Sequence, residues 1–314
     1  MEPSEFEQYQ LELLNRARAD PGAEVVRRSG STWGDNPVFV PGTLFPQPQA
    51  PDLNEGLTAG TIADTPKQPL AFNPNLIGLA RQYGTDLLAA NQFTHTLNGT
   101  TLSHRANDAG FTGWFTLGEN LAVTDSSGTH IVNEAQSLAH HVNLFVDNNV
   151  IGRGHRTSMM NGSFREIGIG MADSTTHTLF PCCSNAALST QDFGAIASDV
   201  FLTGVVYNDL DFDDFYSPDG EGLGPAVVAA TPLGGGSALT TSTYASGGYA
   251  LKLPDGDYSV TVTGFFGAQP LGTVTISGQN VKLDAINPIP EPAGLLFLIA
   301  AVRVVVRRRR SAVR

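Results

Sequence analysis

Three stretches of the chain repeat apolar residues at intervals of three and four positions, the spacing of an amphipathic helix. The first begins at Ser4, with Glu7 three residues later as in a capping box, and Asp20, followed by proline and glycine, ends it. The second begins at Asn73, a capping residue followed by proline, and the third covers about residues 133–146. The expected buried positions are Phe6, Tyr9, Leu13 and Ala17, then Leu76, Leu79, Tyr83 and Leu87, then Ala135, Leu138, Val142 and Phe145.

The pattern changes to alternation from about Ile167 onward. The stretches REIGIGMA, HTLFPC and LSTQDFGAI predict short strands. Between the first two helices, a proline-rich insertion from Asn36 to Pro69 predicts an ordered loop without regular structure. Helices followed by an antiparallel meander favour an α/β sandwich.

A second run of strands begins after Ser198, separated by turns rich in glycine, aspartate and proline. This spacing is typical of a small all-β sandwich. The sequence therefore predicts an α/β domain over residues 1–198, a β-sandwich over residues 199–285 and a tail over residues 286–314.

Composition supports a folded, non-nucleic-acid-binding protein. The chain is 41% apolar and 15% charged, which is ordinary globular material. Six of its 18 basic residues lie in the last dozen positions, so the rest of the chain has 12 basic residues against 30 acidic ones, a net charge of −18. A phosphate backbone needs a basic surface, so nucleic acid is disfavoured as a partner. The adjacent Cys182 and Cys183 say little about the compartment.

The C-terminal tail has the order of parts of a targeting segment. Pro290, Glu291 and Pro292 precede a mostly apolar stretch, Ala293 to Val306, which four consecutive arginines follow. The stretch is shorter than the roughly 20 residues of a stable membrane span and contains Arg303. Arginines hold such a segment on the cytoplasmic side, so the pattern favours a transient inner-membrane anchor.

This tail resembles the PEP-CTERM sorting signal of Gram-negative bacteria. The resemblance implies an exosortase-type sorting enzyme as a partner, processing near Pro290–Pro292 and export to the cell surface or extracellular matrix. The alternative is a fortuitous apolar tail. An exported protein also needs a signal peptide, but MEPSEFEQYQ is acidic and polar, so we expect the true leader upstream of this start.

Two histidines and a carboxylate are candidates for a metal site. His95 follows the second predicted helix, Glu119 lies in LGENLA and His155 in GRGHR, each expected on a loop between elements. Imidazole nitrogen together with carboxylate oxygen suits zinc and similar divalent ions. Spacing alone leaves open that these histidines are surface or hydrogen-bonded residues. We expect the glycines at 152 and 154 to aim His155 inward, and the flanking Arg153 and Arg156 to pair with carboxylates.

Five stretches resemble the bacterial CAP domains, also called SCP-like (cysteine-rich secretory, antigen 5 and pathogenesis-related proteins). They are EQYQLELLNRARADPGA, FTH, GENLA, GRGHRTSMMNGSFREIGIGMA and TQDFG, spread over about residues 5 to 197. The resemblance implies an α-β-α sandwich with a central cleft that two histidines and two acidic residues line. His95, Glu119 and His155 match three of these positions. Asp147 is our choice for the fourth, with Glu134 as the competitor.

A group of carboxylates in the β-rich region has the spacing of a calcium loop. Asp209, Asp211 and Asp213 alternate and Glu221 follows, as in an EF-hand-like cage of oxygen ligands. Asp214 replaces the turn glycine and Glu221 falls one position late, so a solvated acidic turn is the alternative. The region resembles the calcium-binding B-type (Sdr/Cna-like) repeats of surface adhesins, or carboxypeptidase-regulatory-like sandwiches.

Three kinds of function remain open. The first, which we favour, is an exported binding protein whose cleft takes a divalent metal and a small lipid-like ligand, an extracellular polysaccharide or a protein. The second is a metal-dependent hydrolase with Glu119 as base. The third is a structural matrix protein with a vestigial cleft. The sequence lacks a serine or cysteine nucleophile pattern, which argues against covalent catalysis. The other histidines are expected at the surface or partly packed: His104, His130, His140, His141 and His177.

Overall fold

The computed structural model describes residues 1–31, 51–126, 132–177, 179, 183–264 and 267–288. Its helices are α1 (Glu5–Ala19), α2 (Pro21–Arg27), α3 (Pro74–Ala90), α4 (Leu102–Asp108), α5 (Glu134–Val146) and α6 (Gly154–Met159), with a 3-10 turn at Leu97–Gly99. Its strands are β1 (Ala71–Phe72), β2 (Trp114–Ser126), β3 (Glu166–Ser174), β4 (Asn185–Ile196), β5 (Phe201–Asp209), β6 (Val227–Pro232), β7 (Leu239–Ser242), β8 (Gly248–Lys252), β9 (Gly256–Gly264), β10 (Gly267–Ile276), β11 (Val281–Lys282) and β12 (Ala285–Pro288).

The three long helices begin at the capping residues that the sequence predicts. Ser4 forms a full capping box with Glu7 at the start of α1, and the side chains of Asn73 and Asn133 cap α3 and α5. Asp20 does more than end α1, because its side chain accepts a hydrogen bond of 2.9 Å from the backbone N–H of Ala23 and so starts α2. The short helices α2, α4 and α6 were not predicted.

The first sheet has four strands in the order β1-β3-β4-β2, and it is not the predicted meander. β3, β4 and β2 are antiparallel, but β1 runs parallel to β3 and β2 precedes α5 in the chain. In the expected strand HTLFPC, His177 and Leu179 lie outside any strand, and positions 178 and 180–182 lie outside the described residues.

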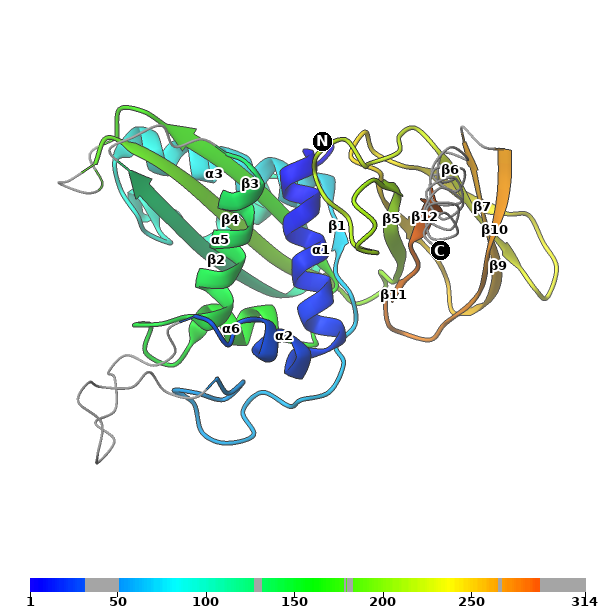
Figure 1. Ribbon diagram of the computed structural model, residues 1–314, viewed down its shortest axis with the longest axis horizontal. Coiled ribbons are helices and arrows are strands. Elements are labelled where there is room, and N and C mark those ends of the chain that lie inside the picture. Colours follow the sequence, from blue (N-terminus) through cyan, green and yellow to red (C-terminus); the bar gives the residue numbers. More distant parts are fainter. Residues whose placement is uncertain (32–50, 127–131, 178, 180–182, 265–266, 289–314) are drawn as a thin grey trace, which may run out of the picture.

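Helices cover both faces of this sheet (Figure 1). Gly168 of β3 lies directly against α3, because a Cβ atom there would stand 2.0 Å from the backbone carbonyl carbon of Leu76. Its neighbour Ile169 points to the opposite face and packs in one buried core with Leu14 of α1 and Phe145 of α5. The expectation of a mixed α/β fold is confirmed.

Helix α1 is buried on nearly every side. One face packs with the sheet and α5, while Tyr9 and Leu13 on another face join Val205 and Tyr207 of β5 in a separate buried cluster. The structure has an α/β part, residues 5–196, and a β part, residues 201–288, and Figure 1 shows α1 between the sheet of the first part and the β part. Tyr9 and Leu13, which the sequence predicts to be buried, are therefore covered by β5 of the β part.

The β part contains two sheets that share a core. One has the strand order β10-β9-β6-β7, and in the other β5 pairs with β8, β11 and β12. Buried residues from both sheets form one cluster, including Leu202, Val228, Tyr249 and Val260.

The joint between the two parts is made of buried polar contacts. Lys282 of β11 pairs with Glu12 of α1 at 2.8 Å and also with Asp284. The side-chain amide of Asn280 donates to the carbonyl oxygens of Pro69, at 3.0 Å, and Arg165, at 2.7 Å. Because Glu12 is only 3% exposed, its charge depends on Lys282 for compensation.

The tail with Pro290, Glu291 and Pro292 lies outside the described residues. Within the part of the chain that the structure describes, no helix is both long and apolar enough to cross a membrane.

Candidate functional site

Glu119 lies in the middle of β2 and not on a loop as expected. Nδ1 of His95 donates to one of its carboxylate oxygens at 2.7 Å, and the guanidinium of Arg105 pairs with the other. The Glu119 side chain is only 3% exposed, whereas that of His95 is 54% exposed. The buried carboxylate therefore orients a histidine whose ring faces solvent.

Arg105 of α4 is a site residue that the sequence analysis missed. Its guanidinium carbon lies 3.5 Å from the centroid of the Tyr83 ring, and it donates to the carbonyl oxygen of His95 at 3.0 Å. Arg105 and Tyr83 also line a groove of about 660 Å³ between α3 and the segment 97–109, with Leu79 and Leu97 among its apolar walls. Nothing in the local sequence distinguishes this arginine from a surface residue.

Asp192 is a second missed residue, paired directly with Glu119 across β2 and β4. It is fully buried, and burial, followed by the neighbouring Glu119 carboxylate, raises the pKa of Asp192 well above its ordinary value. A signal was present, since a central strand with four consecutive buried polar residues, 189–192, breaks the expected apolar pattern.

His155 forms the second histidine–carboxylate pair. Its Nδ1 donates to Asp147 at 2.7 Å, and its backbone N–H donates to the other Asp147 oxygen at 2.9 Å. Asp147 caps the C-terminus of α5 in the left-handed conformation, with φ 54°. The competitor Glu134 lies at the other end of α5, beside Tyr9. His155 sits in the first turn of α6 rather than on the expected loop.

Glu119 and Asn120 are neighbours in the edge strand β2, so their side chains point to opposite faces of the sheet. Next to Glu119, the side chain of Asn120 donates to the carbonyl oxygen of His155 at 3.2 Å. A neutral imidazole that gives Nδ1–H to a carboxylate carries its lone pair on Nε2, which is the form that metal-ligating histidines take. Among the described residues, no three ligand atoms from the two pairs lie within 4.8 Å of one another, so each pair by itself offers an imidazole nitrogen to a zinc-like ion.

The acidic residues of the β part do converge. Among the described residues, Asp209, Asp211 and Glu221 are the group of three potential ligands whose oxygens lie within 4.8 Å of one another. Asp213 is not in this group, and its carboxylate accepts a hydrogen bond of 2.8 Å from the backbone of Phe215. Burial, together with the carboxylates of Asp211 and Asp209, raises the pKa of Glu221, although hydrogen bonds from the backbone of Ser217 and Leu210 lower it.

The remaining histidines differ partly from expectation. His104 is exposed beside Asp108, but His140 and His141 are fully buried and His177 is almost fully buried. Position 130 lies outside the described residues. His141 contacts Glu24 at 2.9 Å, and Glu24 belongs to α2, a helix that the sequence analysis does not predict.

Arg153 and Arg156 pair with a carboxylate, as the sequence analysis predicts. Their partner is Glu55, at 2.8 Å from Arg153 and 3.4 Å from Arg156. Glu55 comes from the proline-rich insertion, and no sequence pattern connects that insertion with His155.

A helix-covered sheet with two histidine–carboxylate pairs agrees with the α-β-α sandwich that the resemblance to CAP domains implies. The chain belongs to the cysteine-rich secretory protein (CAP) family, whose model matches residues 11–184.

Three solved structures show local likeness to the chain. An extracellular SCP-domain protein from Bacillus anthracis is 20% identical over 41% of this chain and 34% of its own, with a TM-score of 0.29. An outer surface protein from Borrelia burgdorferi is 20% identical over 40% of this chain and 77% of its own, with a TM-score of 0.30. NaASP2, solved with Zn²⁺, is 15% identical over 61% of this chain and 80% of its own, with a TM-score of 0.33. The chain thus spans about a third of the length of the Bacillus protein, and no curated protein matches it.

Proposed function

We propose that this protein is an exported CAP-family binding protein whose cleft holds a divalent, zinc-like ion through Nε2 of His95 and of His155. The observation that carries the proposal is that both imidazoles donate Nδ1–H to a buried carboxylate, Glu119 in one pair and Asp147 in the other. Such carboxylates fix the tautomer of a ligating histidine and increase its basicity.

The groove beside Arg105 is the proposed place for an organic ligand. Its volume of about 660 Å³ is in the range of small-molecule sites, and apolar Leu79 and Leu97 lie beside the polar groups of Tyr83 and Arg105. This mixture suits a small amphipathic or lipid-like molecule. An extracellular polysaccharide, which would favour aromatic and polar walls, is the alternative ligand.

The contacts of Glu119 support binding rather than hydrolysis. A general base needs a free oxygen within reach of its proton donor. In this structure His95 and Arg105 engage the two Glu119 oxygens. Water that reacts with Glu119 as base would share the carboxylate oxygens with these two contacts.

Zinc titration of the full chain by calorimetry tests the metal proposal. We expect His95→Ala and His155→Ala each to lower Zn²⁺ affinity at least about tenfold, with little loss of stability, because both side chains are partly exposed. His104→Ala is the matched control, since His104 is exposed and paired with Asp108. Equal Zn²⁺ affinity in all three variants would place the site elsewhere.

For the β part, we propose a B-type, calcium-binding sandwich module. Three of the four expected ligands, Asp209, Asp211 and Glu221, offer clustered oxygens of the kind that calcium prefers. The four-residue set of the sequence analysis therefore requires Asp213 to turn away from the backbone of Phe215.

For the tail, we propose recognition at Pro290, Glu291 and Pro292 by an exosortase-type enzyme after transient anchoring in the inner membrane. The support is the order of the triplet, the apolar stretch and the arginines in the sequence. Mass spectrometry of the released protein, made in a host with this machinery and a supplied signal peptide, tests it. A released form that ends at Arg314 would refute the sorting proposal.

A further inference from the structure

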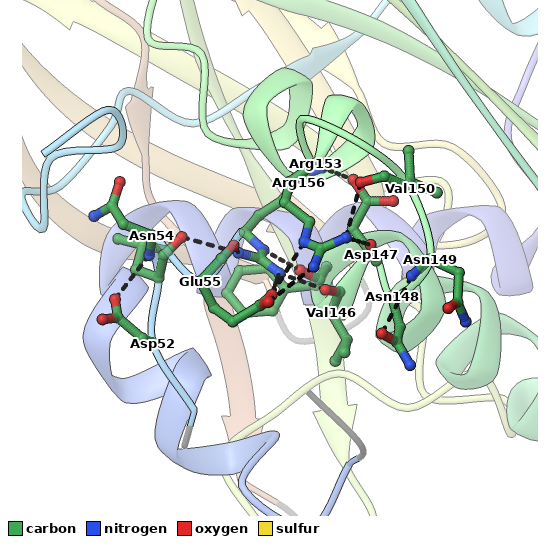
Figure 2. Close-up of polar contacts among 12 residues, drawn as sticks. Asp52, Asn54, Glu55, Val146, Asp147, Asn148, Asn149, Val150, Arg153 and Arg156 are labelled. Carbon is green, nitrogen blue, oxygen red and sulfur yellow. Dashed lines mark hydrogen bonds and ion pairs between the residues drawn. The ribbon is translucent and has the colours of Figure 1, made fainter. Parts of the chain in front are cut away.

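A short segment of the proline-rich insertion lies beneath the loop that carries His155. Figure 2 shows Glu55 next to Arg153 and Arg156, the two arginines on either side of Gly154 and His155. All three charged side chains are buried, with exposures of 7% for Glu55, 2% for Arg153 and 0% for Arg156. A buried charge must be compensated, so this contact is part of how the loop holds its shape.

The carboxylate of Glu55 serves both arginines. It accepts two hydrogen bonds from Arg153, at 3.0 Å from Nε and at 2.8 Å from Nη2, and a longer one from Arg156 at 3.4 Å. The paired bonds to Arg153 have the two-pronged geometry that fixes a guanidinium in direction as well as in distance.

The other donors of the same arginines hold the end of α5. Arg153 donates to the carbonyl oxygens of Asp147, at 3.2 Å, and Val150, at 2.8 Å. Arg156 donates to that of Phe145 at 2.7 Å, and its Nη1 reaches back to the carbonyl oxygen of Glu55 at 2.9 Å. The insertion, the end of α5 and the start of α6 are thereby tied together through two guanidinium groups.

The loop between α5 and α6 needs such support, because its backbone is unfavourable. Asp147, Asn149 and Arg153 all have positive φ, at 54°, 62° and 45°. Non-glycine residues in this region store conformational strain, which surrounding contacts must offset. Arg153 also packs closely against the insertion, since a Cβ atom on Gly56 would stand 2.3 Å from Nε of Arg153.

We propose that Glu55 is a positioning residue for His155. By neutralising and orienting Arg153 and Arg156, it keeps the loop in the shape in which Asp147 receives both the backbone N–H and Nδ1 of His155. The direction of the imidazole ring, and with it of Nε2, follows from that bond. The insertion is therefore part of the site. The measurement of Zn²⁺ affinity described below rests on the proposed function.

The test compares Glu55→Gln with Glu12→Gln in the full chain. Both substitutions remove a buried carboxylate that pairs with a cation, but Glu12 pairs with Lys282 at the joint to the β part. We expect Glu55→Gln to lower Zn²⁺ affinity about ten- to hundredfold, the usual effect of losing an orienting partner of a metal site. Glu12→Gln should leave Zn²⁺ affinity unchanged even where it lowers thermal stability.

A second readout does not need the metal. Without Zn²⁺, the ¹H–¹⁵N spectrum of the His155 imidazole reports which ring nitrogen carries the proton, and amide exchange reports the His155 N–H bond to Asp147. We expect Glu55→Gln to alter both and Glu12→Gln to alter neither. Unchanged imidazole and amide signals in Glu55→Gln would overturn the positioning role. Altered signals in a chain that binds no Zn²⁺ would keep that role and refute the metal proposal.

Arg153→Lys covers the case in which Glu55→Gln does not fold. Lysine keeps the charge beside Glu55 but cannot donate to the carboxylate and to two carbonyl oxygens in the same directions. We expect Arg153→Lys to alter the His155 imidazole and amide signals in the same direction as Glu55→Gln, but by a smaller amount. Wild-type signals in Arg153→Lys would overturn the proposal.

Discussion

Glu166, the first residue of β3, accepts a hydrogen bond of 2.7 Å from the side-chain amide of Asn73, the capping residue of α3. Glu166 is only 1% exposed. Burial is the main cause that raises the pKa of Glu166 to about 7, although the bond from Asn73 lowers it. The Glu166 carboxyl group, at the junction of β3 and α3, therefore titrates near neutral pH.

We predict that the stability of the wild-type chain falls as the pH rises through about 7. The pKa of Glu166 is higher in the folded than in the unfolded state, so its contribution is complete below the ordinary glutamate pKa and is lost as the buried group ionises. The shift corresponds to roughly 3 kcal/mol. Urea unfolding at pH 5 and pH 8 measures the change in the free energy of unfolding, and this change should be smaller in Glu166→Gln. The same change in the variant as in the wild type would assign the pH dependence to other groups.

Gly168→Ala should destabilise the chain by about 3 kcal/mol, since the new methyl group would overlap the backbone of Leu76 in α3, which side-chain rotation cannot relieve. Chemical denaturation measures the loss. The matched control is Gly234→Ala, where a Cβ atom meets nothing within 4 Å and the change should stay within about 0.5 kcal/mol. Similar stability in both variants would contradict the close contact of β3 with α3.

Calcium should stabilise the full chain through the cluster of Asp209, Asp211 and Glu221. At about 100 times its Kd, a ligand that binds only the folded state adds about 2.7 kcal/mol. Thermal unfolding with calcium and with chelator measures the effect, which Asp211→Asn should abolish. Asp219→Asn is the control, because Asp219 is exposed and outside the cluster. Equal midpoints with and without calcium would reduce the cluster to an acidic turn.

Glu24→Gln should be most harmful at neutral pH and less so in acid. Although burial raises the pKa of Glu24, the contact with His141 and the neighbouring Arg16 and Arg28 lower it to about 2. Its stabilising contribution is therefore present above the ordinary glutamate pKa and lost as the pH falls toward 2. We expect the difference between the wild type and the variant to narrow from pH 7 to pH 3 in urea unfolding. A constant difference would mean that shape, and not charge, matters at this position.

Local signals in the sequence were sufficient for the main helices. Ser4, Asn73 and Asn133 each cap the helix expected of them, because a cap depends on atoms a few residues away. The choice of His95, Glu119, His155 and Asp147 rested on family resemblance, and the structure joins these residues in two pairs.

Features that depend on distant partners could not be read from the sequence. β2 contains glycine, glutamate and asparagine, which disfavour strands, and it forms because it pairs with β4 along its length. His140 and His141 looked like surface residues of one helix, but Thr124 of β2 and Glu24 of α2 contact their imidazoles. Glu55 meets Arg153 across 98 positions of chain.

The ion pair between buried Glu12 and partly exposed Lys282 also fixes the α/β part relative to the β part. To bend at the joint, the chain would have to separate these two charges, expose Tyr9 and Leu13, and release the carbonyl oxygens that Asn280 binds. The two parts therefore move as one rigid unit, in which His95 keeps a constant position relative to the β part.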